Sequence, residues 1–223
     1  MRNYPVSMGH PGVKLLVPTS WRPLAWLLLG LAVVVVAVLG LRYAGQTDPG
    51  HFDAALDTRL AVRLGGHRQL LDRLVMLGNP YSVVATALVL ANMLALLRPG
   101  RAVLLALVGP ALGGILTELV LKPLVGRTIG GGLAFPSGHT TGAFSLALVA
   151  GLVLLPSGAH GLPGLPLMVR VGLAVGGLAL AGGTATAMVA LRAHYATDTL
   201  GGVGVAVVAV LGTALILDAI CDG

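Results

Sequence analysis

Two short stretches of the chain combine histidines with cationic and acidic residues in a pattern suited to phosphate chemistry. In chain order the candidates are Lys122, Arg127, Ser137, Gly138, His139, Arg192, His194 and Asp198. Lysine and arginine bind phosphoryl oxygens, one histidine can attack phosphorus, and another can protonate the leaving oxygen. The two stretches together therefore indicate a site that binds and transfers a phosphoryl group.

The first stretch contains the predicted start of a helix. Pro136 ends any preceding helix, and Ser137 is a favoured N-cap residue. Free N–H groups and the positive end of the dipole make such a first turn an anion site, and Gly138 allows an anion to approach the backbone. His139 lies in the same turn. The alternative is a simple capped helix start that happens to carry a histidine.

The second stretch pairs a histidine with an aspartate. His194 and Asp198 are four residues apart and would share one face of a helix. The carboxylate could then orient the imidazole and leave the other ring nitrogen free as a nucleophile. If the helix begins only at Thr197 or Asp198, the pair lies in a turn. The alternative is a surface histidine beside a helix-capping aspartate.

The cationic residues also have structural alternatives. Glu118 lies one turn before Lys122 and could pair with it. Arg127 and Arg192 could instead extend to the lipid headgroups. We expect Lys122, Arg127 and Arg192 to bind the phosphate oxygens.

The composition places these residues in an integral membrane protein. Of 223 residues, 56% are hydrophobic and 10% are charged, whereas soluble domains carry about 25% charged residues. Six apolar runs are long enough to suggest membrane helices. They cover Leu24–Leu41, Pro80–Leu97, Ala102–Leu121, Gly138–Leu155, Val169–Leu191 and Thr199–Leu217. The predicted fold is an all-α polytopic bundle of six transmembrane helices.

Three other parts complete the predicted organisation. Residues 1–22 form a polar tail, 23–217 a single six-helix membrane domain, and 218–223 a short second tail. Residues 42–79 are polar and amphipathic, so we expect them to lie along the membrane surface after the first helix. Six spans put both ends of the domain on one side and both candidate stretches at the opposite face.

The net charge and the residue composition exclude several classes of protein and of binding site. A net charge of +6 on a membrane chain is typical of basic loops and anionic lipid contacts, so we expect no nucleic acid partner. One cysteine excludes a thiolate zinc cluster, and no carboxylate cluster suits magnesium. Outer-membrane barrels are excluded because their strands alternate with a period of two. We expect neither a metal nor a cofactor, and nothing indicates an oligomeric state.

With these residues in place, the chain resembles the type 2 phosphatidic acid phosphatase superfamily over residues 80–205. The second family motif, P-S-G-H, is intact at residues 136–139, and the third keeps its catalytic half from His194 to Asp198. The first motif keeps Lys122. Two family arginines are absent, where Ile129 and Met188 stand instead. We hypothesise that Arg127 and Arg192 replace them.

The resemblance implies a metal-independent lipid phosphatase. His194 would form a phosphohistidine, Asp198 would orient it, and His139 would protonate the leaving oxygen. The expected substrate is a lipid phosphate or diphosphate, first of all a polyprenyl diphosphate. The enzyme would lie in the cell membrane with its site on the extracytoplasmic face, although the loop charges alone do not favour this orientation. The alternatives are a lipid or sugar phosphotransferase with the same intermediate, and a lipid-binding member with little activity.

Overall fold

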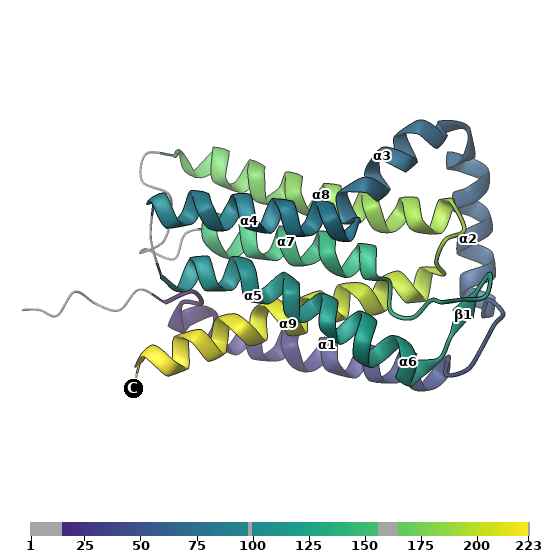
Figure 1. Cartoon of the computed structure of the whole chain (residues 1–223), viewed down its shortest axis with the longest axis horizontal. Helices are drawn as coiled ribbons and strands as arrows, with labels where there is room; N and C mark the ends of the chain where they lie inside the picture. The colour runs from purple at the N-terminus through teal and green to yellow at the C-terminus, as the bar shows by residue number, and fades with distance from the viewer. Residues whose placement is uncertain (1–14, 98–99, 156–164, 223) are drawn as a thin grey trace, which may run out of the picture.

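The protein folds as a bundle of roughly parallel and antiparallel helices (Figure 1). The computed structural model describes residues 15–97, 100–155 and 165–222. The bundle helices are α1 (Arg22–Arg42), α4 (Pro80–Leu97), α5 (Arg101–Ile115), α7 (Gly138–Leu154), α8 (Leu167–Ala190) and α9 (Ala196–Asp222). Helix α9 packs against α1, α5 and α7. Buried small and branched residues such as Leu105, Val149 and Val210 form the core between these helices.

The expected count of six spanning helices is not confirmed. Among the described residues, five segments are long and apolar enough to cross a membrane, and α7 is an apolar helix of 17 residues. At a rise of about 1.5 Å per residue, α7 is shorter than the ~30 Å of hydrocarbon. Its N-cap, Ser137, is fully buried, so α7 begins inside the bundle rather than at its end.

The third span is not a uniform α-helix. After Pro110, α5 passes into the π-helical segment η3 (Leu116–Leu121) and then into α6 (Lys122–Val125). π-helical turns are rare and occur often at functional sites. This one carries Glu118 and ends directly before Lys122.

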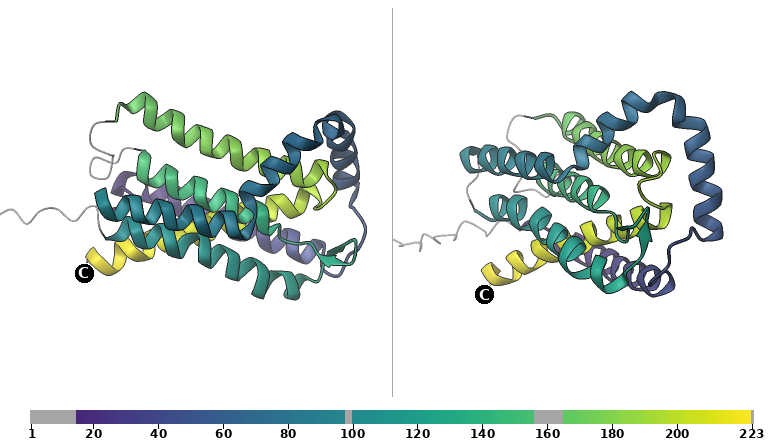
Figure 2. Two further views of the ribbon diagram at one scale, coloured as in Figure 1. Left: turned by 45° about the horizontal axis from the view of Figure 1, so that its top comes forward. Right: turned by 45° about the vertical axis from the view of Figure 1, so that its right-hand side comes forward.

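Two further helices lie across one end of the bundle (Figures 1 and 2). Helix α2 (His51–Leu64) and α3 (Arg68–Gly78) are joined by a 3₁₀ turn, η2 (Gly65–His67). They form an arch beside the ends of α8 and α9. The predicted amphipathic segment after the first span is therefore helical and crosses the bundle axis, but it also contributes a fully buried side chain, Asp53.

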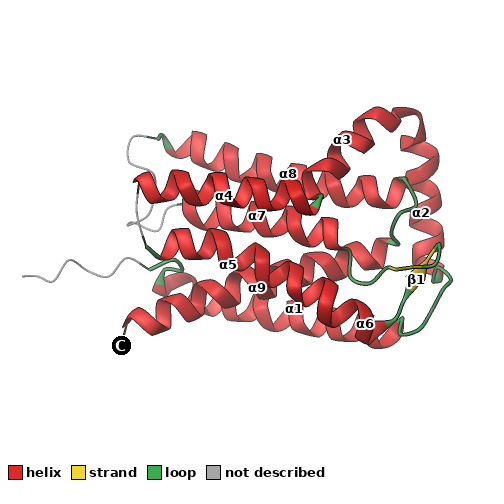
Figure 3. Ribbon diagram, viewed as in Figure 1, coloured by secondary structure: helices red, strands yellow, loops and turns green. Residues whose placement is uncertain are grey.

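A short antiparallel hairpin lies near α2 (Figure 3). Strands β1 (Thr128–Ile129) and β2 (Gly132–Leu133) pair Thr128 with Leu133 and Ile129 with Gly132. The turn consists of Gly130 and Gly131, both at positive φ, where a Cβ would be unfavourable. The hairpin leads the chain from α6 to the start of α7.

The opposite end of the bundle holds the start of α1 and the end of α9, as the topology predicted (Figure 1). Parts of both expected tails belong to the fold. Residues 218–222 continue α9, and the 3₁₀ turn η1 (Thr19–Trp21) precedes α1. Buried Asp218 accepts hydrogen bonds from the backbone N–H groups of Leu16 and Val17, each at 2.8 Å, and pairs with Arg101 at 3.2 Å.

Candidate active site

A cavity of about 710 Å³ lies between α4, α5 and the start of α7, beside Gly78 at the end of α3. One part of its wall is polar and is formed by Glu118, Lys122, His139 and His194. The rest is apolar and is formed largely by α4 and α5, including Val83, Ala87, Leu107, Pro110 and Ala111. The cavity is thus amphiphilic, with both predicted catalytic histidines at its polar end.

The start of α7 holds His139 at the cavity wall. Ser137 caps the helix, since its Oγ accepts a hydrogen bond from the Thr140 N–H at 3.4 Å. The Ser137 N–H donates to the carbonyl of Asp198 at 3.0 Å, which joins the two motifs. Gly138 and His139 line the cavity, whereas Ser137 is fully buried beneath it.

His194 and Asp198 do not share a helix face. Helix α9 begins at Ala196, so His194 lies in the preceding loop and Asp198 in the first turn. The turn geometry still brings His194 Nδ1 to 3.6 Å from Asp198 Oδ2. Nδ1 is buried and, among the described residues, has no hydrogen-bond partner at this separation. A small approach of the two groups would make the orienting hydrogen bond.

The carboxylate of Asp198 is held from two directions. Oδ2 accepts the Tyr195 N–H at 3.0 Å, and Oδ1 accepts Arg127 Nη1 at 2.7 Å. Asp198 itself is fully buried. Its orientation toward His194 is therefore fixed by groups that do not line the cavity.

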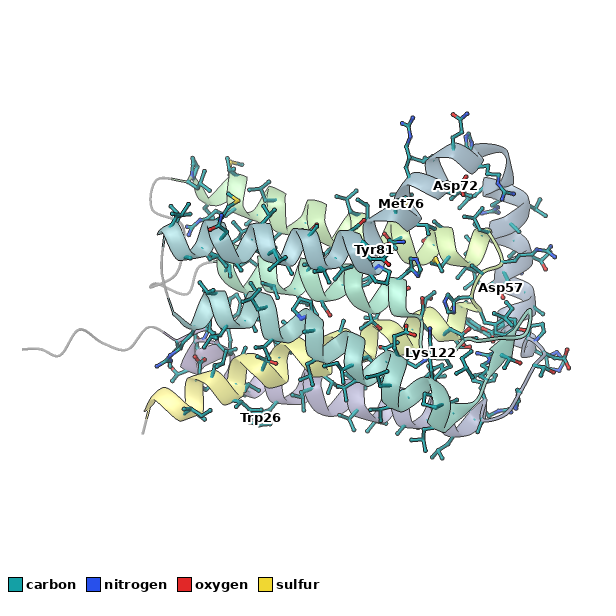
Figure 4. The ribbon with its side chains drawn as sticks, in the orientation of Figure 1. Trp26, Asp57, Asp72, Met76, Tyr81 and Lys122 are labelled. Atoms are coloured by element: carbon teal, nitrogen blue, oxygen red, sulfur yellow. The ribbon has the colours of Figure 1, made fainter. Side chains whose placement is uncertain are left out.

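Lys122 is the cationic side chain among the described residues that line the cavity. Its Nζ donates to both carboxylate oxygens of Glu118, at 2.9 and 2.8 Å. Glu118 also lies against the first turn of α7, where a Cβ on Gly138 would clash with its Oε1. The Glu118–Lys122 pair that the sequence offered as an alternative is thus present, and both residues line the polar end of the cavity. Figure 4 labels Lys122.

Arg127 does not line the cavity, and its side chain contacts other residues. It is fully buried, and its Nη2 pairs with Asp53 Oδ2 at 2.6 Å while Nη1 contacts Asp198. Its guanidinium lies between the rings of Tyr43 and Tyr195, at 4.1 and 4.2 Å from their centroids. In this position, the structure does not support the expected contact between Arg127 and a phosphate in the cavity.

Arg192 lies outside the cavity wall as well. It is exposed, follows the end of α8, and has φ +57°, an uncommon value for a residue with a Cβ. Met188, which stands where the family has an arginine, lines the cavity instead. The structure thus brings Lys122, Gly138, His139 and His194 to the cavity, with Asp198 directly behind.

Sequence reasoning missed the two aspartates of α2. Asp53 Oδ1 accepts the Thr197 N–H at 2.9 Å, and Asp57 Oδ1 accepts the Ala196 N–H at 3.2 Å. Burial raises the pKa of Asp57 to about 6, and neighbouring Asp53 and Asp198 add to the rise. Asp53 and Asp57 are four residues apart and lie on the face of α2 that also carries Leu60 and Leu64. Charged residues on an otherwise apolar helix face were the feature of the sequence that could have identified them.

In the part of the chain that the structure describes, no three His, Cys, Asp or Glu side chains gather in a way that could hold a metal ion. The polar end of the cavity offers two imidazoles, the start of a helix, and one ammonium group that is paired with the Glu118 carboxylate. This set can bind an anion and move protons.

Comparison with solved structures found a protein of similar fold. A transmembrane PAP2-type phosphatidylglycerolphosphate phosphatase from Bacillus subtilis is similar to this chain, with a TM-score of 0.66 and 16% sequence identity. The match covers 89% of this chain and 96% of that one. No protein-family model and no curated protein matched the sequence. The chain therefore shares its fold with this PAP2-type phosphatase, in agreement with the resemblance seen in its motifs.

Proposed function

We propose that the protein is a membrane phosphatase that hydrolyses a lipid phosphate or diphosphate. The amphiphilic cavity is the observation that carries this proposal. Its polar end holds His139, His194 and Lys122, and its apolar wall is made largely by α4 and α5. A phosphate headgroup fits the first part and an acyl or prenyl chain the second.

The first chemical step transfers the phosphoryl group to His194. Its Nδ1 faces Asp198, so Nε2 is the nitrogen available to attack phosphorus. The bond from phosphorus to the leaving oxygen breaks as the N–P bond forms, and protonated His139 gives its proton to that oxygen. The lipid alcohol, or the lipid monophosphate from a diphosphate, leaves.

The second step hydrolyses the phosphohistidine. Neutral His139 removes a proton from water, the resulting oxygen attacks phosphorus, and the N–P bond breaks to release phosphate. His194 returns to its neutral form and His139 to its protonated form. Both steps use side chains of this chain and require no added metal.

Positive charge for the phosphate comes from Lys122 and the first turn of α7. The substrate phosphate must compete with Glu118 for Lys122, because Glu118 is paired with it. We propose that Arg192, which is exposed on the loop two residues before His194, adds a second cation when substrate is bound. An Arg192→Ala variant with unchanged turnover and unchanged KM would contradict this role.

A polyprenyl diphosphate is the substrate that we propose first, followed by phosphatidic acid and phosphatidylglycerol phosphate. The long apolar wall suits a single extended chain. The site would lie on the extracytoplasmic face of the cell membrane, where a lipid phosphate reaches the membrane–water boundary.

The proposal is tested by phosphate release from detergent-purified protein with a panel of these lipids in EDTA. We expect release by the wild type and none above background by His194→Ala. Release that requires added metal, or that persists in His194→Ala, would contradict the mechanism. A new phosphoester in place of free phosphate would indicate a phosphotransferase, and lipid binding without turnover would indicate a binding protein.

A further inference from the structure

A buried network of charges connects α2 to the predicted nucleophile. Asp53, Arg127 and Asp198 are each fully buried, and together they form two short ion pairs, Asp53–Arg127 at 2.6 Å and Arg127–Asp198 at 2.7 Å. His194 follows at 3.6 Å from Asp198. Asp53 and Arg127 are 74 positions apart in sequence, so the network exists only in the folded chain.

Asp53 also holds the start of α9 directly. Its Oδ1 accepts the Thr197 N–H at 2.9 Å, and its Oδ2 accepts the Thr197 hydroxyl at 2.9 Å. That hydroxyl also receives Arg127 Nη1 at 2.6 Å. The first turn of α9, which carries Asp198, is thus fixed both through its backbone and through its carboxylate.

Aromatic rings fix the plane of the guanidinium. Arg127 lies between Tyr43 and Tyr195, and the Tyr195 hydroxyl donates to the Thr47 carbonyl at 2.8 Å. A stacked arginine whose two Nη groups bind two different carboxylates has a fixed orientation, which the single ammonium group of lysine could not reproduce. The position of Asp198 therefore depends on Arg127, and that of Arg127 on Asp53.

The charges of the network suit the proposed intermediate. With all groups ionised, Asp53, Arg127 and Asp198 sum to one negative charge. Phosphorylation of His194 at Nε2 leaves a proton on Nδ1 and gives the ring positive character, next to Asp198. A buried ion pair contributes little net stability compared with apolar packing, so stability alone is a poor explanation of three buried charges.

We propose that Asp53 is a positioning residue for the reaction: through Arg127 it aims the Asp198 carboxylate at Nδ1 of His194. This inference rests on the proposed phosphohistidine chemistry of His194. Asp53 does not line the cavity, and it acts by setting which ring nitrogen of His194 carries the proton.

The first test compares Asp53→Asn with Asp57→Asn, a matched change one helical turn away. Asp57 also accepts a hydrogen bond from the start of α9 but makes no hydrogen bond or ion pair with Arg127 among the described contacts. In rapid-quench experiments with a lipid phosphate, we expect Asp53→Asn to slow phosphorylation of His194 about 100-fold, the loss typical of a misplaced catalytic group. KM and the fraction of molecules that become labelled should stay within threefold of wild type. Asp57→Asn should change the rate less than threefold.

Arg127→Lys provides a second variant that keeps the positive charge. It should be as slow as Asp53→Asn, because lysine cannot hold both carboxylates in one plane. A purely structural role would lower the labelled fraction and leave the rate constant of the remaining molecules unchanged. That result, or an unchanged rate in Asp53→Asn, would overturn the proposal.

A second readout does not depend on turnover. ¹⁵N NMR of ring-labelled histidine, with His194→Ala for assignment, reports which nitrogen of His194 carries the proton at high pH. We expect the proton on Nδ1 in the wild type and a shift toward Nε2 in Asp53→Asn. The same tautomer in both proteins would overturn the proposal even if the wild type proved inactive on every lipid, an outcome that would refute the proposed function separately.

Discussion

Glu118 occupies a position in which a carboxylate works against phosphate binding. It neutralises Lys122 and lies against the first turn of α7, so an incoming phosphate must break the ion pair and meet a like charge. Replacing Glu118 by glutamine keeps the size and removes the charge. We expect Glu118→Gln to lower KM for a lipid phosphate several-fold, with kcat changed less than threefold. Initial rates across lipid concentrations test this, and a KM that is unchanged or higher would show that Glu118 supports binding.

The residue types in the motifs predicted that the two histidines and Lys122 lie together at one site. They did not predict which residues Arg127 pairs with. Tetrapeptide and spacing patterns report local geometry, such as the capped start of α7 at Ser137. The pairing of Arg127 with Asp53 depends on how α2 folds back across the bundle, and no local pattern carries that information. Arg127 was therefore expected at the phosphate and lies instead between two carboxylates.

At the scale of elements, the contact between α7 and α9 brings the two motifs together. Gly202 of α9 lies so close to the start of α7 that a Cβ would stand 2.6 Å from the Ser137 carbonyl oxygen. We expect Gly202→Ala to lower the melting temperature by several degrees, since overpacking costs about 1–3 kcal/mol. The matched control is Gly172→Ala on α8, where a Cβ meets nothing within 4 Å. It should leave the melting temperature unchanged or raise it, and an equal loss in both variants would contradict this account.

Asp57 on α2 makes the stability of the protein depend on pH. Its pKa is raised to about 6, so the folded state binds this proton more tightly than the unfolded chain does. The contribution of Asp57 to stability is therefore greatest at low pH and falls as pH rises from about 4 through about 6. Asp57→Asn should match the wild type at pH 4 and melt about 2–4 °C higher at pH 8. This is the shift for about 1 kcal/mol in a chain of this size, because the partial exposure of Asp57 to water reduces the effect of its raised pKa. Thermal unfolding at both pH values tests this, and a variant less stable than wild type at pH 8 would contradict it.

At the scale of the whole molecule, the cavity is expected to hold the chain of a lipid substrate in its apolar part. Ala111 lines the apolar part, away from His139 and His194, so Ala111→Trp should obstruct the lipid chain but not the phosphate. We expect about a tenfold or greater loss of kcat/KM for a long-chain lipid phosphate and little change for a water-soluble aryl phosphate. Ala179→Trp, at an exposed position on α8 outside the cavity lining, is the control. Equal losses for both substrates would show that the apolar part does not hold the chain.

The membrane class and the bundle could be predicted from apolar run length, because hydrocarbon thickness sets that length directly. The count of six spans is not confirmed, since α7 is shortened by a capped start that lies inside the bundle. The π-helical turn before Lys122 likewise left no sequence signal that we recognised. Both departures lie at the site, where local geometry serves positioning rather than regular packing.

The most direct test of the central claim is to trap the intermediate. Wild-type protein would be mixed with a ³²P-labelled lipid phosphate in EDTA, quenched in base within milliseconds, and analysed by peptide mass spectrometry. We predict one acid-labile, base-stable phosphoryl group per active molecule, attached to His194 and absent from His194→Ala. Phosphate release without any labelled histidine, or a label on His139 instead, would contradict the assignment of His194 as the nucleophile.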